Sequence, residues 1–355
     1  MGNTKGIEFC WFAPTAGDKR EIGTGEYISA PDVNYVIDVS QKAEENGFDS
    51  ILVPVCDKCM DPFIVSALIL QNTKKIKTIT AINPGMASPQ VLGTMISTII
   101  NKFGNRIDLN LIKGNISTAI KQGLIVKEES ELANLLDEFT SCLIELLQSQ
   151  EPVTFDGSII KLNSAQVIPH ALQAPKIYIG GGPFSLDIAA KNSNTYLMFA
   201  DSLEKVNAGV RNAQQMSIDK YNRHIDIGIG LNVVARKTHL EAIEACNKLI
   251  SNVPRNTRLK MKYYYSKNSI MGRTIKEIEQ KNYFLEDNIW LGLAKARIGP
   301  ITTLYGSYEE VSDKIKRYHD VGVTCFSLTS YPLLEEVERI GENIIPKLIN
   351  LKEDN

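Results

Sequence analysis

The chain has 355 residues with a formal net charge of −2 at pH 7, and 43% of its residues are hydrophobic and 23% charged. These are ordinary globular values, and so small a net charge gives no electrostatic reason to expect a nucleic acid or an anionic membrane as a partner. No apolar run is long enough to span a bilayer, so we expect a soluble, cytoplasmic protein. Six scattered cysteines in so long a chain argue against a disulfide scaffold.

Eight short apolar runs alternate with helix-length segments along the whole chain. Most of the runs are continuously hydrophobic, which is typical of parallel strands buried on both faces. A doubly wound open sheet would need a glycine-rich dinucleotide fingerprint after its first strand, and residues 12–25 have none. The pattern therefore predicts an α/β fold of the (β/α)8 TIM-barrel type. The expected strands are residues 6–13, 50–55, 76–83, 106–112, 176–181, 195–200, 225–235 and 323–331.

Helix candidates with recognisable ends lie between these strands. Gly47 is a stop signal for the first of them, and Ser307 with Glu310 forms a capping-box pattern at the start of another. The expected helices are residues 30–47, 183–192, 202–216, 239–252, 307–322 and 333–351.

Two insertions interrupt the barrel pattern, at about residues 113–170 and 253–305. The first contains a predicted helix at 131–148 and a predicted hairpin at 152–163. The second is polar and basic, and a long polar excursion in a compact domain is usually a lid or a disordered segment. We expect one barrel domain over residues 1–355, in which residues 253–305 form a mobile lid.

The C-terminal ends of the strands are where a barrel of this type places its active site. Three consecutive glycines, Gly180, Gly181 and Gly182, follow the fifth strand, and Ser185 lies near the start of the next helix. Glycines let backbone N–H groups approach an anion, and a helix N-terminus favours negative charge, so this turn is a candidate phosphate site. A tight turn without a ligand is the alternative. Other polar, aromatic or thiol side chains at the strand ends belong to Trp11, Cys56, Cys59, Asn83, Asn110, Lys113, Asn232 and Tyr331.

Cys56 and Cys59 stand two residues apart at the end of the second strand. They could form a metal clip or a redox couple, or one of them could be a thiol that lines a pocket. A single Cys-x-x-Cys without a second thiol pair or nearby histidines is a poor zinc site, so we expect no metal. The residues alone leave the other two possibilities open.

Six segments resemble, in order and spacing, the flavin-dependent alkanesulfonate monooxygenases of the bacterial luciferase-like superfamily. The resemblance covers nearly the whole chain and implies a (β/α)8 barrel. It also implies reduced FMN supplied by a separate NAD(P)H-dependent flavin reductase, O2 as co-substrate, and a flavin hydroperoxide that oxygenates a small organic substrate. Family habit suggests a homodimer or homotetramer. The matching segments are residues 11–18, 51–62, 110–114, 178–182, 290–299 and 330–336.

The resemblance also suggests roles for individual residues. Cys59 falls on the family's active-site cysteine, which implies a single thiol near the flavin, with Cys56 as local variation. Arg297 falls on a lid arginine, whose guanidinium would grip oxyanions in bidentate fashion. Tyr331 falls on a tyrosine whose hydroxyl would bond to the cofactor or the substrate. The residues expected to bind the cofactor are Trp11, Asn110, Gly180, Gly181, Gly182 and Ser185.

The chain departs from the family pattern at several charged positions. Ala16, Asn232 and Leu333 stand where the family has histidines, and Gly230 stands where it has an arginine. Residues 128–133 lack the family's Asp-His-x-x-Arg-Tyr run. With Asn232 and Leu333 in the substrate pocket, an alkanesulfonate would lose its counter-charges. We therefore expect a less anionic or differently shaped substrate, such as an organosulfur compound or a natural-product intermediate.

Two other functions stay open on the sequence. The shortage of polar pocket groups would suit a non-catalytic barrel or a partner subunit with weak or altered flavin binding. A deazaflavin-dependent oxidoreductase of the same superfamily is the further alternative.

Overall fold

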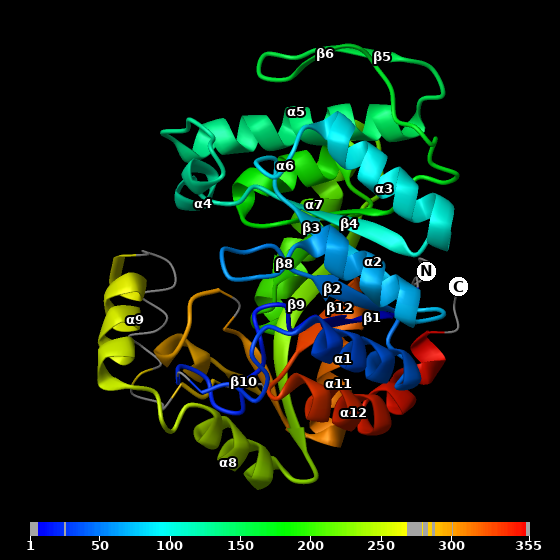
Figure 1. Ribbon diagram of the computed structural model, residues 1–355. Coiled ribbons are helices and arrows are strands. Elements are labelled where there is room, and N and C mark those ends of the chain that lie inside the picture. Colours follow the sequence, from blue (N-terminus) through cyan, green and yellow to red (C-terminus); the bar gives the residue numbers. More distant parts are fainter. Residues whose placement is uncertain are drawn as a thin grey trace. The chain divides into compact units, whose positions relative to one another are not determined.

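The computed structural model describes residues 6–24, 26–267, 279, 283–285, 288–299 and 301–352 (Figure 1). Its main sheet has the strand order β10-β11-β9-β12-β1-β2-β3-β4-β7-β8 with an additional β9–β8 pairing, so eight parallel strands close into a barrel. The predicted (β/α)8 barrel is confirmed. Its strands are β1 (Glu8–Phe12), β2 (Ser50–Val53), β3 (Lys77–Ile82), β4 (Ile107–Ile112), β7 (Ile177–Gly180), β8 (Thr195–Phe199), β9 (Asp226–Arg236) and β12 (Val323–Thr329).

The helices follow the barrel strands as the sequence predicts. Where the sequence predicts one helix over 333–351, the structure has α12 and then a 3-10 segment, η2 (Ile345–Leu351), because Pro346 has no N–H to continue the helix. The α-helices are α1 (Val33–Glu45), α2 (Pro62–Asn72), α3 (Pro89–Phe103), α4 (Ile116–Lys121), α5 (Glu129–Gln148), α6 (Pro183–Asn192), α7 (Leu203–Tyr221), α8 (His239–Leu249), α9 (Arg255–Lys267), α11 (Tyr308–Asp320) and α12 (Leu333–Asn343).

The chain divides into two compact units. The first comprises Met1–Phe48, Phe199–Val210 and Gly228–Asn355. In it β1 pairs in parallel with β12, and β11 (Thr303–Ser307) pairs in parallel with β9. A capping box starts α11, since Ser307 Oγ accepts from the Glu310 N–H at 3.2 Å and a Glu310 carboxylate oxygen accepts from the Ser307 N–H at 2.7 Å. The capping box predicted from the sequence is therefore confirmed.

The second unit comprises Asp49–Met198 and Arg211–Ile227. Strands β2, β3, β4, β7 and β8 pair in parallel there, each with the next. All four residues of β2 are buried, as expected of a strand covered on both faces. The predicted hairpin is present as β5 (Val153–Asp156) and β6 (Lys161–Ala165), and Figure 1 shows it beside α5.

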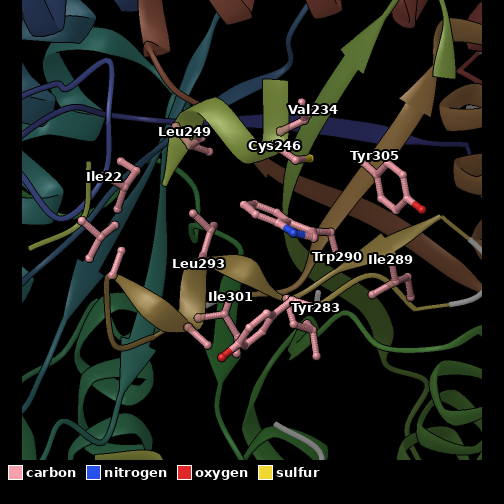
Figure 2. Packing of buried hydrophobic residues seen from close by; sticks show 14 of the residues in the cluster. Ile22, Val234, Cys246, Leu249, Tyr283, Ile289, Trp290, Leu293, Ile301 and Tyr305 are labelled. Atoms are coloured by element: carbon pink, nitrogen blue, oxygen red, sulfur yellow. The ribbon is translucent and has the colours of Figure 1, made fainter. Parts of the chain in front are cut away.

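The second insertion contributes buried structure that sequence patterns did not predict. Its two-residue strand β10 (Ile289–Trp290) pairs antiparallel with β11. Figure 2 shows the Trp290 indole among Cys246, Leu293 and Tyr305, and Trp290 is fully buried. Residues 268–278, 280–282, 286, 287 and 300 of the predicted mobile lid lie outside the described residues. The mobile lid therefore stays a prediction.

Within the described ranges, no helix combines the length and the apolar composition needed to cross a membrane.

Candidate active site

Arg297 and Tyr331 lie together in the first unit. The Arg297 Nη1 donates a hydrogen bond to the Tyr331 hydroxyl at 2.5 Å, and the guanidinium carbon lies 6.0 Å from the centre of the tyrosine ring. Arg297 follows the 3-10 segment η1 (Gly292–Lys295), and Tyr331 follows β12. The structure thus brings together two of the three residues predicted to be catalytic.

The backbone of Arg297 is fixed from two sides. Its N–H donates to the Leu293 carbonyl at 3.0 Å, and its carbonyl accepts from the Tyr265 hydroxyl of α9, also at 3.0 Å. Burial raises the pKa of Tyr265 to about 12, so this phenol stays neutral and keeps its proton to donate at physiological pH. A helix of the second insertion therefore holds the peptide that carries the candidate arginine.

Asp18 fixes the turn that carries Tyr331. Its Oδ2 accepts from the Leu333 N–H and from the Tyr35 hydroxyl, each at 2.7 Å, and its Oδ1 accepts from the Lys19 N–H at 2.7 Å. Asp18 is fully buried, and burial raises the pKa of its carboxyl group despite these bonds. Leu333 begins α12, whose own N-cap residue supplies no side-chain bond. Asp18 takes that place, where a carboxylate is favoured by the helix dipole.

These residues, Asp18, Arg297, Tyr331 and Leu333, are called the arginine cluster below. Sequence reasoning missed Asp18, although it stands in the segment that follows the first strand. An acidic residue in the loop after the first predicted strand, residues 6–13, is the one signal in the sequence that would have marked it.

The two residues predicted to line the substrate pocket are both buried in the first unit. Leu333 has its N–H bonded to Asp18, and Asn232 Nδ2 donates to the Thr302 carbonyl at 3.2 Å. Two residues before Asn232, a Cβ added to Gly230 would meet no atom within 4 Å. The alkanesulfonate monooxygenases that the sequence resembles have an arginine at this position. In this chain, the space beside the Gly230 backbone is open.

Trp11 is part of the hydrophobic core of the first unit. It is fully buried, and its ring centre lies 5.3 Å from that of Phe48. Its indole N–H has no hydrogen-bond partner among the residues that the structure describes. These contacts show a packing role, and the cofactor role of Trp11 stays a prediction.

The glycine turn, Gly180 to Gly182, links β7 to α6 in the second unit. Gly181 has φ +140°, which favours glycine, and its N–H donates to the Leu197 carbonyl at 3.3 Å. Ser185 is buried behind the turn, with Oγ 2.7 Å from the place that a Cβ on Gly181 would take. A Cβ on Gly182, by contrast, would meet nothing within 4 Å. The turn is therefore closed at Gly181 and open at Gly182.

Asn110 lies on β4 beside this turn. Its side chain is buried, and its Oδ1 lies 3.8 Å from the place of a Cβ on Gly180. Within the described part of the chain, Asn110 Oδ1 has no hydrogen-bond partner. Buried acceptors are normally bonded, so this oxygen is suited to a donor that a ligand brings.

The third predicted catalytic residue, Cys59, is bonded to Cys56 in a disulfide, with 5.1 Å between their Cα atoms. The interpretation of Cys59 as a single thiol is therefore wrong for this structure. The physical reason is a local turn, in which the Cys59 N–H donates to the Cys56 carbonyl at 3.1 Å and brings the two side chains together.

The chain matches the family model described as luciferase-like monooxygenase over residues 7–325. It belongs to this family. Membership of the luciferase-like superfamily, implied by the sequence resemblance, is thereby confirmed, and so is the prediction of an oxidoreductase of the flavin-dependent monooxygenase class. The match does not extend to the alkanesulfonate specificity of the family that the sequence resembles.

Solved structures of other proteins share the fold of this luciferase-like monooxygenase at low sequence identity. EDTA monooxygenase (EmoA) of Chelativorans sp. BNC1 has 14% identity and a TM-score of 0.80, with 98% of this chain and 94% of that chain covered. The FMN complex of the oxygenating constituent of 3,6-diketocamphane monooxygenase from Pseudomonas putida has 17% identity, a TM-score of 0.72, and coverage of 96% and 99%. The coenzyme F420-dependent tetrahydromethanopterin reductase of Methanopyrus kandleri has 19% identity, a TM-score of 0.71, and coverage of 97% and 99%.

Proposed function

We propose that this luciferase-like monooxygenase uses reduced FMN, delivered by a separate NAD(P)H-dependent flavin reductase, and O2 to oxygenate a small organic molecule. The substrate is an organosulfur compound or a natural-product intermediate with little negative charge. The observation that carries the proposal is the buried Asn110 Oδ1, which has no partner among the described residues and lies 3.8 Å from the place of a Cβ on Gly180, the first residue of the glycine turn.

The residues of the second unit fit the two ends of FMN. A flavin ring carries N–H groups, and Asn110 Oδ1 is a buried acceptor in need of a donor. The open side of Gly182 allows a ligand to approach the backbone closely, and the N-terminus of α6 favours a phosphate. When bound, reduced FMN supplies the electrons and the reaction with O2.

The arginine cluster would supply a fixed donor pair in the first unit. Arg297 is always charged, and it donates to the Tyr331 oxygen. Because that oxygen already accepts a bond, the hydroxyl proton of Tyr331 is available to an acceptor on the substrate or cofactor. We assign Arg297 the stabilisation of developing negative charge and Tyr331 the donation of a hydrogen bond. The insertion that contains α9 would then serve as the lid that excludes water.

Gly230 supports a weakly charged substrate. Where the resembled family has an arginine, the space beside Gly230 is open, and Leu333 offers an apolar side chain in place of a histidine. An anion would lose those counter-charges, whereas a neutral or bulkier molecule would gain volume.

The test is binding of reduced FMN, followed by fluorescence under anaerobic conditions. Asn110→Leu removes the amide oxygen at similar volume, so we expect a fold as stable as the wild type but affinity lowered about tenfold, since one hydrogen bond from a ligand is lost. Asn105→Leu is the matched control, because Asn105 Oδ1 is also buried and without a partner among the described residues but lies before β4 rather than on it. Equal affinity of the Asn110→Leu variant and the wild type would contradict the proposal.

Titration with a second cofactor, reduced deazaflavin, distinguishes the oxygenase from the alternative oxidoreductase function. The same titration with reduced deazaflavin should show weaker binding than reduced FMN, and O2 consumption in the presence of a flavin reductase should need FMN. Tight binding of the deazaflavin alone would support the alternative oxidoreductase function.

A further inference from the structure

The disulfide on the loop between β2 and α2 plays no part in the proposed oxygenase function. We propose that the Cys56–Cys59 pair is a thiol–disulfide exchange site, at which a dithiol reductant opens the bond in the folded protein. In the oxidised form the pair holds this loop against α4, and in the reduced form the loop is released. The inference concerns the second unit alone and does not rest on the oxygenase function.

Access to the two sulfur atoms differs from access to the other cysteines. Cys56 is exposed and Cys59 is half-buried, whereas Cys10, Cys142, Cys246 and Cys325 are buried and take no part in a disulfide. Burial also raises the pKa of the Cys142 thiol to about 11, which keeps it from forming the reactive thiolate. An external thiolate therefore reaches Cys56 in preference to any other sulfur of the described chain.

The exchange takes place in two steps. A thiolate of the reductant attacks Cys56 Sγ, the Cys56–Cys59 bond breaks, and Cys59 leaves as a thiolate that takes a proton from water. The second thiolate of the reductant then attacks the reductant's own sulfur in the mixed disulfide, so the reductant leaves as an intramolecular disulfide and Cys56 leaves as a thiolate that takes a second proton from water. Two electrons pass to the protein. Hydrogen peroxide reverses the step, because two thiols and one peroxide give a disulfide and two water molecules.

Asp57, which stands between the two cysteines, gives the site a structural effect. Its carboxylate forms an ion pair with Lys121 and accepts a hydrogen bond from the Thr118 hydroxyl at 3.3 Å. Both partners belong to α4. The next residue, Gln122, has its Oε1 2.4 Å from the place of a Cβ on Gly85, which follows β3. Loops after β2, β3 and β4 therefore meet at α4.

The strength of this anchor depends on the disulfide. Lys121 and Asp57 are both exposed, and an exposed ion pair stabilises little by itself because solvent screens it and two long side chains must be ordered. The bond between Cys56 and Cys59 restricts the backbone of Asp57 and so lowers that ordering cost. Without the bond, the carboxylate is expected to leave α4 for water.

Alkylation and hydrogen exchange on the full chain test the proposal. Native protein should take up no iodoacetamide before reduction and two equivalents after treatment with dithiothreitol, with unchanged far-ultraviolet circular dichroism. Reduction should also make amide exchange several-fold faster in residues 54–60 and in α4. No labelling of native protein after dithiothreitol, or two labels without faster exchange in α4, would overturn the proposal.

Two variants separate the bond from the anchor. The double variant Cys56→Ser with Cys59→Ser should show the faster exchange in both segments with or without dithiothreitol. Asp57→Asn should show faster exchange in α4 while its loop stays slow until the disulfide is reduced. If α4 exchanges in Asp57→Asn at the wild-type oxidised rate, Asp57 is not the link and the proposal is wrong.

Discussion

The arginine cluster in the first unit and the glycine turn in the second differ in how far the protein itself satisfies their polar groups. In the cluster, Arg297 donates a hydrogen bond to the Tyr331 hydroxyl, and Asp18 accepts one from the Leu333 N–H. Beside the turn, Asn110 Oδ1 has no partner in the described residues, and Gly182 faces open space. A group that is already oriented needs no reorganisation during a reaction, whereas an unsatisfied one is completed by binding. The first region is thus suited to a positioning role, and the second agrees with our proposal that it binds the cofactor.

The largest effect on stability should come from removing the Asp18 carboxylate, because it satisfies several polar groups of the arginine cluster. Asp18→Ala leaves three donors without their acceptor: the buried N–H of Leu333, and the partly buried N–H of Lys19 and hydroxyl of Tyr35. We expect the free energy of unfolding to fall by about 3 kcal/mol or more in urea titrations. Asp38→Ala, an exposed acid on α1, is the control and should change it by less than about 0.5 kcal/mol. An equal loss in both variants would remove the case for Asp18 as the cap of α12.

The glycine turn offers a pair of adjacent variants with opposite expected outcomes. Gly181→Ala should destabilise the fold by about 1–3 kcal/mol, because φ is +140° and the new Cβ would lie 2.7 Å from Ser185 Oγ. The Cβ that Gly182→Ala adds would meet no atom within 4 Å, so this variant should be about as stable as the wild type. It should nevertheless weaken binding of reduced FMN about tenfold, because the methyl group enters the space proposed for the ligand. Wild-type binding by the Gly182→Ala variant would show that the open side is not a ligand site.

The smallest effect concerns Glu138, a carboxylate that holds backbone N–H groups as Asp18 does but near the surface. Burial would raise the pKa of Glu138, but hydrogen bonds from the Ser158 hydroxyl and from the N–H groups of Ile160, Ile159 and Ser158 outweigh it and lower the pKa to about 2. Since the folded pKa lies below the ordinary value of 4.5, this contribution is present above pH 4.5 and is lost as the pH falls toward 2.

Glu138→Gln should therefore lower the melting temperature slightly at pH 7, by the equivalent of less than about 1 kcal/mol, and by less still at pH 3. Glu145→Gln, at an exposed residue of the same helix, is the matched control and should change stability by less than about 0.5 kcal/mol. A constant difference across this pH range would mean that the charge of Glu138 does not anchor the hairpin.

The barrel strands could be predicted because each is an apolar run, and most of their residues are buried. Strands β10 and β11 could not be predicted. Strand β10 has only two residues, and neither it nor its partner β11 lies in a segment with a periodic hydrophobic pattern. Asp18 was missed for a related reason, because its bond to Leu333 joins residues 315 positions apart. Arg297 and Tyr331 were found through the resemblance. The same resemblance suggested a single thiol at Cys59, because it describes the family's pocket and not the neighbouring Cys56 of this chain.

The close packing of Gly292 on Trp290 has a consequence for how this enzyme can change. A Cβ on Gly292 would lie 2.0 Å from the Trp290 ring, so the segment that leads to Arg297 packs tightly on the core where it begins. Exposed positions on α9, such as Leu259 and Tyr263, do not take part in this packing. Natural divergence or laboratory evolution can therefore change the exposed face of α9 while the guanidinium of Arg297 keeps its place.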